Sequence, residues 1–208
     1  MTDREAIICS SPTTPLIDEV EKRVSIGVTS SNEMLEKGRK GKMSRENFSK
    51  SLGLTSSLDG NQNYAAGYFE DAPKFFVKVV DVNDPSVIWA RNLLETDQSA
   101  FPLFPTIYSV TTANDKAILI MSRVKAYTED DNEFYKEKYI DYFDGRSTYG
   151  YDFKEGEISL LEKHKDFLEE ILLVHGLVDS CTIDSHDGNF VTDENGLVIF
   201  VDPLYKYR

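Results

Sequence analysis

The chain has 208 residues, of which 40% are hydrophobic, and its 36 acidic and 23 basic side chains give a formal net charge of −13. This length and composition predict a single domain that can bury a sizeable core. The negative charge argues against direct binding to nucleic acid, because contacts with phosphates need Lys and Arg, and it favours basic protein partners.

Nothing in the sequence predicts export or insertion into a membrane. No apolar run approaches the roughly 18 residues of a membrane span, and the first residues lack the basic and apolar regions of a signal peptide. The two cysteines, Cys9 and Cys181, lie far apart without metal-ligand spacing, so we expect reduced thiols. We therefore expect the protein to stay in the cytoplasm of the cell that makes it.

Residues 1–50 are predicted to form an N-terminal extension. Apolar residues recur at helical spacing between Pro15 and Val28 and predict a short amphipathic helix. Residues 37–45 carry five basic side chains and no acidic one, which is typical of a solvated linker. A second short helical piece is predicted from Arg45 to Leu52.

A polar loop and a strand follow the extension. Gly60 and Asn61 open the loop, where backbone N–H groups can approach a phosphate because glycine has no side chain. The run Phe75–Val80 is typical of a strand and has Lys78 near its centre. A buried ammonium there would need a counter-charge, and the alternative is a Lys that faces solvent.

An Asp-Pro pair then supplies an N-cap and a first-turn proline, and predicts a helix over about residues 84–97. Glu95 is the acidic residue on this helix with a register suited to pair with Lys78. Arg91, one turn earlier, offers Glu95 an ordinary surface pair instead. Both alternatives stay open. Two further strands are predicted over residues 106–110 and 117–121.

The second half begins with an acidic stretch, residues 129–144, which is either a solvated helix face or a docking surface for basic substrates. Apolar residues at helical spacing then predict a helix of roughly 18 residues from about Glu157. Two apolar runs, 190–191 and 197–201, flank a turn cluster and predict a short hairpin.

Three polar residues stand around this hairpin at intervals of five and thirteen residues: Asp184, Asn189 and Asp202. These are the intervals found in kinase-type phosphotransfer sites, where one Asp orients the attacking hydroxyl and the Asn and second Asp bind magnesium. The helix predicted from about Glu157 leads to the loop with Asp184 and Asn189, and the hairpin brings Asp202 back to the same place. The alternative is a solvated hairpin rich in Asp and Asn.

The same segment resembles the catalytic segment of the early protein kinases of podovirus-type lytic bacteriophages. Their pattern, Asp-x-His-x-Gly-Asn followed by a hairpin and Asp-Pro, is matched here by Asp184, His186, Gly188, Asn189, Asp202 and Pro203. Aminoglycoside-type kinases share the first part, but Asp-Pro in place of Asp-Phe-Gly favours the phage enzymes. Gly60–Tyr68 also resembles their nucleotide loop. The resemblance is clear for about residues 59–78 and 172–204.

The resemblance implies an α+β, small two-lobed protein-kinase-like fold with a minimal C-lobe. Residues 51–124 would form the N-lobe and hinge, and residues 125–208 the C-lobe. Asp184 and Lys78 would be catalytic, and Asn189 and Asp202 would bind Mg²⁺ or Mn²⁺. The residues expected to bind ATP are Gly60, Asn61, Lys78, Glu95, Met121, Ser122 and Val124, the last two in the hinge, residues 122–124, that meets adenine.

The expected function is that of a Mg-ATP-dependent serine/threonine protein kinase that phosphorylates host proteins in the host cytoplasm during host takeover. Thr182 and Ile183 stand where His and Arg are usual before the catalytic Asp, so control by loop phosphorylation is not expected. Two alternatives remain. One is a small-molecule phosphotransferase, and the other is an acidic kinase-like binding protein that inhibits a host or defence factor.

Overall fold

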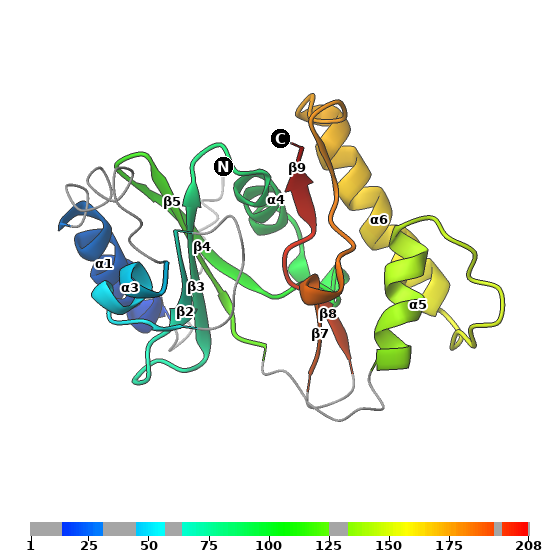
Figure 1. Ribbon diagram of the computed structural model, residues 1–208, viewed down its shortest axis with the longest axis horizontal. Coiled ribbons are helices and arrows are strands. Elements are labelled where there is room, and N and C mark those ends of the chain that lie inside the picture. Colours follow the sequence, from blue (N-terminus) through cyan, green and yellow to red (C-terminus); the bar gives the residue numbers. More distant parts are fainter. Residues whose placement is uncertain (1–13, 31–44, 57–63, 125–132, 194–196, 208) are drawn as a thin grey trace, which may run out of the picture.

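The computed structural model describes residues 14–30, 45–56, 64–124, 133–193 and 197–207. These residues form an α+β structure in which a small antiparallel sheet is followed by a mainly helical second half (Figure 1). The sheet has the strand order β1-β2-β3-β5-β4. Its strands are β1 (Thr55–Ser56), β2 (Ala65–Tyr68), β3 (Phe75–Asp81), β4 (Ile107–Ala113) and β5 (Lys116–Ser122).

Strand β3 alternates between two hydrophobic clusters. Phe75, Val77 and Val79 belong to one cluster, whereas Phe76 and Val80 pack in the other. The reason is the two-residue period of a strand, which sends successive side chains to opposite faces. Lys78 therefore shares a face with Phe76 and Val80. The sheet is buried on both faces, and the strands predicted around residues 75–80, 106–110 and 117–121 are confirmed.

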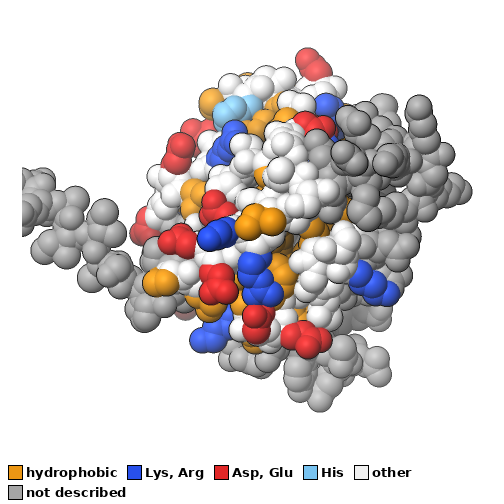
Figure 2. Space-filling view, turned by 90° about the vertical axis from the view of Figure 1, so that its left-hand side faces the viewer, with side chains coloured by type: hydrophobic (Ala, Val, Ile, Leu, Met, Phe, Trp, Pro, Cys, Tyr) orange, Lys and Arg blue, Asp and Glu red, His pale blue; other side chains and the backbone are white. Residues whose placement is uncertain are grey.

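Helices α1 (Thr14–Ser30) and α3 (Arg45–Ser51) cover the face opposite Lys78 (Figure 1). Val20, Val24 and Val28 are fully buried because their spacing of four residues places them on one side of α1. Both predicted N-terminal helices are confirmed. Figure 2 shows the outer surface of this side, where Lys and Arg are interspersed with Asp and Glu rather than gathered in a patch of one sign.

Helix α4 (Pro85–Leu94) follows β3, and its residues Trp89 and Leu93 are buried in the cluster that includes Val80. The Asp84 side chain caps the helix by accepting the Ser86 N–H. The helix ends three residues before the predicted position 97, because Asp97 instead caps the short 3₁₀ helix η1 (Gln98–Ala100).

The described part of the second half contains two α-helices and two short antiparallel ribbons (Figure 1). The helices are α5 (Glu133–Phe143) and α6 (Glu157–Val174), and the second confirms the predicted helix of 18 residues. Strand β7 (Phe190–Thr192) pairs with β8 (Val198–Phe200), which confirms the predicted hairpin. Strand β6 (Cys181–Ile183) pairs with β9 (Leu204–Lys206), a ribbon whose three-residue strands the sequence did not indicate.

Aromatic packing within this half and one backbone hydrogen bond connect it to the segment before β4. The Phe190 and Phe200 rings lie 4.2 Å apart, and Phe143 of α5 lies 5.0 Å from Phe200, measured between centroids. The Phe200 N–H also donates to the Leu103 carbonyl, at 2.6 Å, in the segment that leads into β4. The second half thus packs on the same side of the sheet as Lys78.

A buried ion pair joins α5 to α6. Lys138 Nζ lies 2.6 Å from Glu157 Oε1, and the two side chains are 3% and 10% exposed. The Tyr139 hydroxyl donates to the same carboxylate at 2.7 Å. Burial acts to raise the pKa of Glu157, but the hydrogen bonds from Lys138 and Tyr139 outweigh it, so the pKa lies below its ordinary value of 4.5.

No helix in the described ranges has the length and apolar character needed to cross a membrane. Cys181 is a buried free thiol, and Cys9 lies outside the described residues.

The Lys138–Glu157 pair generates a prediction for stability. Glu157→Gln should lower the free energy of unfolding by about 2 to 3 kcal/mol at pH 7, because the Lys138 ammonium loses its counter-charge. A carboxyl with a lowered folded-state pKa stabilises above its unfolded pKa and loses this effect as the pH falls. The difference from wild type in urea unfolding should therefore shrink below about pH 4. Glu155→Gln, on an exposed neighbour, is the control and should change little at either pH.

Candidate functional site

The candidate site is organised around an ion pair between Lys78 and Asp202. Lys78 Nζ lies 2.6 Å from Asp202 Oδ2. The Lys78 side chain is only 7% exposed, whereas that of Asp202 is 32% exposed. Lys78 lies in the middle of β3 opposite Leu119 of β5. Its side chain is on the sheet face that is covered by the second half of the protein, so it is shielded from solvent. Asp202 thus supplies the counter-charge that a buried ammonium requires.

Backbone hydrogen bonds bring Asp184 and Asn189 beside Asp202. The Asp184 N–H donates to the Pro203 carbonyl at 2.9 Å, and the Val201 N–H donates to the Asn189 carbonyl at 2.8 Å. The loop from β6 to β7 and the loop from β8 to β9 connect the same two ribbons, so they lie side by side. All three residues predicted from spacing therefore meet at one place.

Asn189 is oriented by its own loop. It ends the 3₁₀ helix η3 (Asp187–Asn189), which His186 caps by accepting the Gly188 N–H at its Nδ1 atom. The Asn189 Nδ2 atom donates to the Asp184 carbonyl at 3.0 Å. This bond uses the amide nitrogen and leaves Oδ1 as the group that can bind a cation.

The site carries more negative than positive charge. Burial raises the pKa of Asp202, the charge and hydrogen bond of Lys78 oppose this rise, and the nearby carboxylates of Asp84 and Asp184 add to it. Asp84 was predicted only as a helix cap, and no sequence signal placed it near Asp202. One ammonium among three carboxylates leaves a local charge that a divalent cation would balance.

The residues present fit a magnesium ion shared with phosphates. The oxygen donors are the Asn189 amide and the Asp202 carboxylate, which suit a hard cation such as Mg²⁺ or Mn²⁺. In the described part of the chain, no three His, Cys, Asp or Glu side chains converge to hold a metal by themselves. A magnesium ion held by one or two protein oxygens commonly takes its remaining ligands from water and substrate phosphates.

The structure corrects the predicted role of Glu95. Helix α4 ends at Leu94, so Glu95 is the C-cap residue and is exposed. Among the described residues it pairs with neither Lys78 nor Arg91. The partner of Lys78 is Asp202.

The predicted hinge residues lie at the end of β5. Met121 is buried and Ser122 is half-buried. The Ser122 N–H donates to the Thr106 carbonyl at 2.7 Å, and the Arg123 N–H donates to the Lys74 carbonyl at 2.8 Å. These two donors are therefore engaged within the protein, and base recognition through them would require those bonds to break. Gly60 and Asn61 lie outside the described residues.

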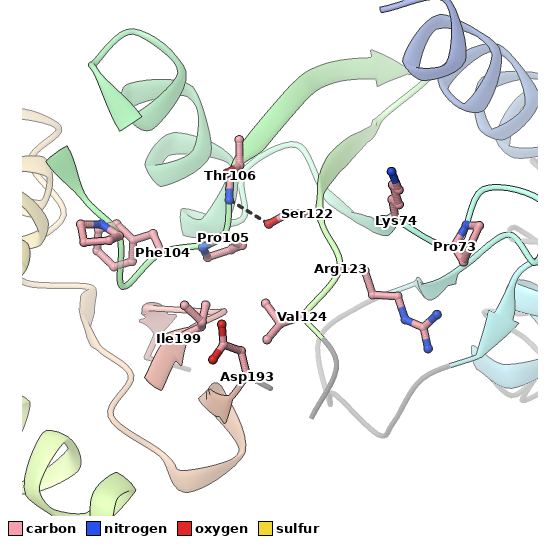
Figure 3. Close-up of a pocket in the computed structure, with 11 residues that line it drawn as sticks. Pro73, Lys74, Phe104, Pro105, Thr106, Ser122, Arg123, Val124, Asp193 and Ile199 are labelled. Carbon is pink, nitrogen blue, oxygen red and sulfur yellow. Dashed lines mark hydrogen bonds between the residues drawn. The ribbon is translucent and has the colours of Figure 1, made fainter. Parts of the chain in front are cut away.

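A cavity of about 540 Å³ lies beside this segment (Figure 3). Its lining includes Ser122 and Val124, together with the apolar side chains of Phe104, Pro105 and Ile199. Neither Lys78 nor Asp202 lines it. The cavity is thus separate from the ion pair and was not predicted, because its walls come from separate stretches of the sequence, at residues 73–74, 102–106 and 122–124 and at Asp193 and Ile199.

The described part of the acidic stretch offers less free charge than its composition suggests. Arg146 lies 3.3 Å from an oxygen of Asp141 and 2.6 Å from an oxygen of Asp144. Residues 129–132, with three more acidic side chains of this stretch, lie outside the described residues, as does most of the basic stretch 37–45, and Glu137 is exposed on α5.

Comparisons of the chain with models of protein families, with curated proteins and with solved structures found no match.

The ion pair generates a second prediction. Lys78→Met should lower the free energy of unfolding by about 1 to 3 kcal/mol at pH 7, because Asp202 stays near two carboxylates without its cation. Its folded-state pKa then rises further above the ordinary 3.8. The folded variant binds the proton more tightly than the unfolded one, so stability should recover as the pH falls from 7 toward about 4.

Chemical denaturation at several pH values checks this prediction. Lys74→Met, at an exposed position just before the same strand, is the matched control and should show no such recovery. An equal and pH-independent loss in both variants would mean that Asp202 does not depend on Lys78.

Proposed function

We propose that this protein is an ATP-dependent phosphotransferase of the protein-kinase type, which transfers phosphate to serine or threonine residues of host proteins. The observation that carries the proposal is the Lys78–Asp202 contact of 2.6 Å, with Asp184 and Asn189 bonded to the backbone on either side of Asp202. Protein kinases use a Lys on the third strand, a magnesium-binding Asp, and a loop that carries the catalytic Asp and a second metal-binding Asn.

The order of the elements supports this proposal. Lys78 lies on the third strand in sequence, β3, and helix α4 follows this strand on the same side of the sheet. The two short ribbons then hold the loop with Asp184 and the loop with Asp202. An α+β fold with these features supports the two-lobed architecture that we propose from the resemblance to phage kinases.

Each side chain has a separate task in the proposed reaction. Lys78 would attract and orient the phosphates of ATP. Asp184 would accept or orient the proton of the acceptor hydroxyl, since no hydrogen bond occupies its carboxylate among the described residues. Asn189 and Asp202 would hold magnesium, which supplies charge neutralisation for the transferred phosphoryl group.

The acceptor class follows from the resemblance and from charge. The phage kinases that the Asp184–Pro203 segment resembles act on host proteins during host takeover. A protein with a net charge of −13 attracts basic partners over roughly 8 to 10 Å at physiological salt. Basic host proteins are therefore the substrates proposed for this site.

The metal is tested by nucleotide binding. ATP should bind more tightly with Mg²⁺ or Mn²⁺ than without, and Asp202→Ala should abolish this enhancement, because the mutation removes the charged metal ligand. Isothermal titration calorimetry measures both affinities. Asp166→Ala, at an exposed residue of α6, is the control and should keep the enhancement. Equal affinity with and without metal in the wild type would exclude this metal assignment.

The reaction is tested by Asp184→Asn. This variant should keep its ATP affinity within a few-fold and lose turnover by roughly 100-fold or more, which is the usual contribution of a positioned acid or base. Labelled ATP and host lysate provide the assay, with Asp179→Asn, at an exposed residue before β6, as the control. Consumption of ATP without labelled protein bands would indicate a small-molecule acceptor. Growth arrest of the host by a variant that phosphorylates nothing would indicate a binding protein.

A further inference from the structure

Helix α5 lies along the loop that carries Asp184. Toward its N-terminal end, Lys136 Nζ lies 3.9 Å from Asp187 Oδ1, and at the turn after the helix the Ser185 hydroxyl donates to Asp144. Positions 136 and 144 are slightly more than two helical turns apart. The helix and its C-terminal turn thus contact the loop at two points, one of them directly next to Asp184.

The two contacts differ in strength. Lys136 and Asp187 are partly exposed and 3.9 Å apart, a geometry that contributes little free energy. The Asp144 carboxylate accepts a direct hydrogen bond from the hydroxyl of Ser185, which is half-buried. A charged acceptor makes this the stronger of the two links. It is the main side-chain tether of the loop between Asp184 and the Asn189 amide.

Asp144 is itself held in place. Arg146 Nη2 lies 2.6 Å from Asp144 Oδ2, and Arg146 Nη1 lies 3.3 Å from Asp141 Oδ1. The Tyr151 hydroxyl donates to the other oxygen of Asp141 at 2.7 Å. With one oxygen bound to Arg146, Asp144 presents the other to Ser185 in a single orientation.

The helix that carries this network is anchored on its other side. The buried Lys138–Glu157 pair, with its contact of 2.6 Å, fastens α5 to the first residue of α6. A tether can position a loop only if its own support is rigid. The connection from α6 through α5 to Ser185 meets this condition.

We propose that Asp144 is a positioning residue for Asp184, acting through the hydroxyl of Ser185. This inference rests on the proposed function. The Asp184 backbone is held by Pro203 on one side, and the Ser185–Asp144 bond holds the next residue, so the two together set the direction of the Asp184 carboxylate. Misplacement of a reacting group by about 1 Å can cost about 100-fold in rate.

The test is a comparison of kinetics and binding in the full-length protein. Asp144→Ala should lower kcat by about 10-fold or more while the ATP dissociation constant and KM for ATP stay within about twofold, because the tether acts on the loop and not on the nucleotide. Asp144→Asn should restore most of kcat, since its amide oxygen still accepts the Ser185 hydroxyl. Asp152→Ala, at an exposed acidic residue nearby, is the control and should leave kcat unchanged.

Ser185 gives the second arm. Ser185→Ala should reproduce the loss of kcat, Ser185→Thr should restore it, and Ser185→Ala combined with Asp144→Ala should be no worse than either alone, because both remove the same bond. Amide hydrogen exchange should be faster at Asp184 and Asn189 in Asp144→Ala, whereas the melting temperature stays close to that of the wild type.

The outcomes separate this inference from the proposed function. A wild-type protein without phosphotransfer would overturn the proposed function and, with it, the catalytic role of the tether. An active wild type whose kcat and loop exchange do not change in Asp144→Ala would overturn the inference alone. Additive losses in the double variant would also overturn it, since the two residues would then act independently.

Discussion

The buried ammonium of Lys78 requires a counter-charge, and this requirement links the sheet to the second half of the protein. It lies in the middle of a strand with neighbours on both sides, where a charge without a partner is strongly unfavourable. Its partner, Asp202, belongs to a loop 124 residues further along the chain. The ion pair therefore joins the sheet to the second half of the protein, and it places a carboxylate where burial already raises the pKa.

Successive side chains of β3 point to opposite faces of the sheet, and this determines which elements pack on each side of the ion pair. One face of the strand packs against α1 and α3. The other face, which carries Lys78, packs against α4 and the aromatic ribbon β7–β8. The two described helices of the predicted N-terminal extension thus contribute to the hydrophobic core of the sheet. Because α1 and α3 cover only the face opposite Lys78, they stabilise the strand without obstructing the site (Figure 1).

Short ribbons position the remaining polar groups. Three-residue strands have little stability of their own. Here the loop between β6 and β7 is joined to the loop between β8 and β9 by backbone hydrogen bonds. The Asp184, Asn189 and Asp202 backbones are thereby held together, Asp202 faces Lys78, and Oδ1 of Asn189 is left for a cation. Helix α5 adds support from the side through Asp144 and Ser185. The proposed chemistry needs little beyond such positioning and charge neutralisation.

Local sequence patterns were enough to predict α1, β3, α6 and the β7–β8 hairpin, and the spacing of Asp184, Asn189 and Asp202 was enough to group these three residues. These depend on local patterns of apolar side chains and turn residues, which a single sequence displays. The folded chain was needed to show that Lys78 pairs with Asp202 rather than Glu95, that β6 pairs with β9, and that Asp144 contacts Ser185. The physical reason is that such contacts join residues far apart in the chain, so they depend on where helices end and how layers pack, which no local pattern encodes.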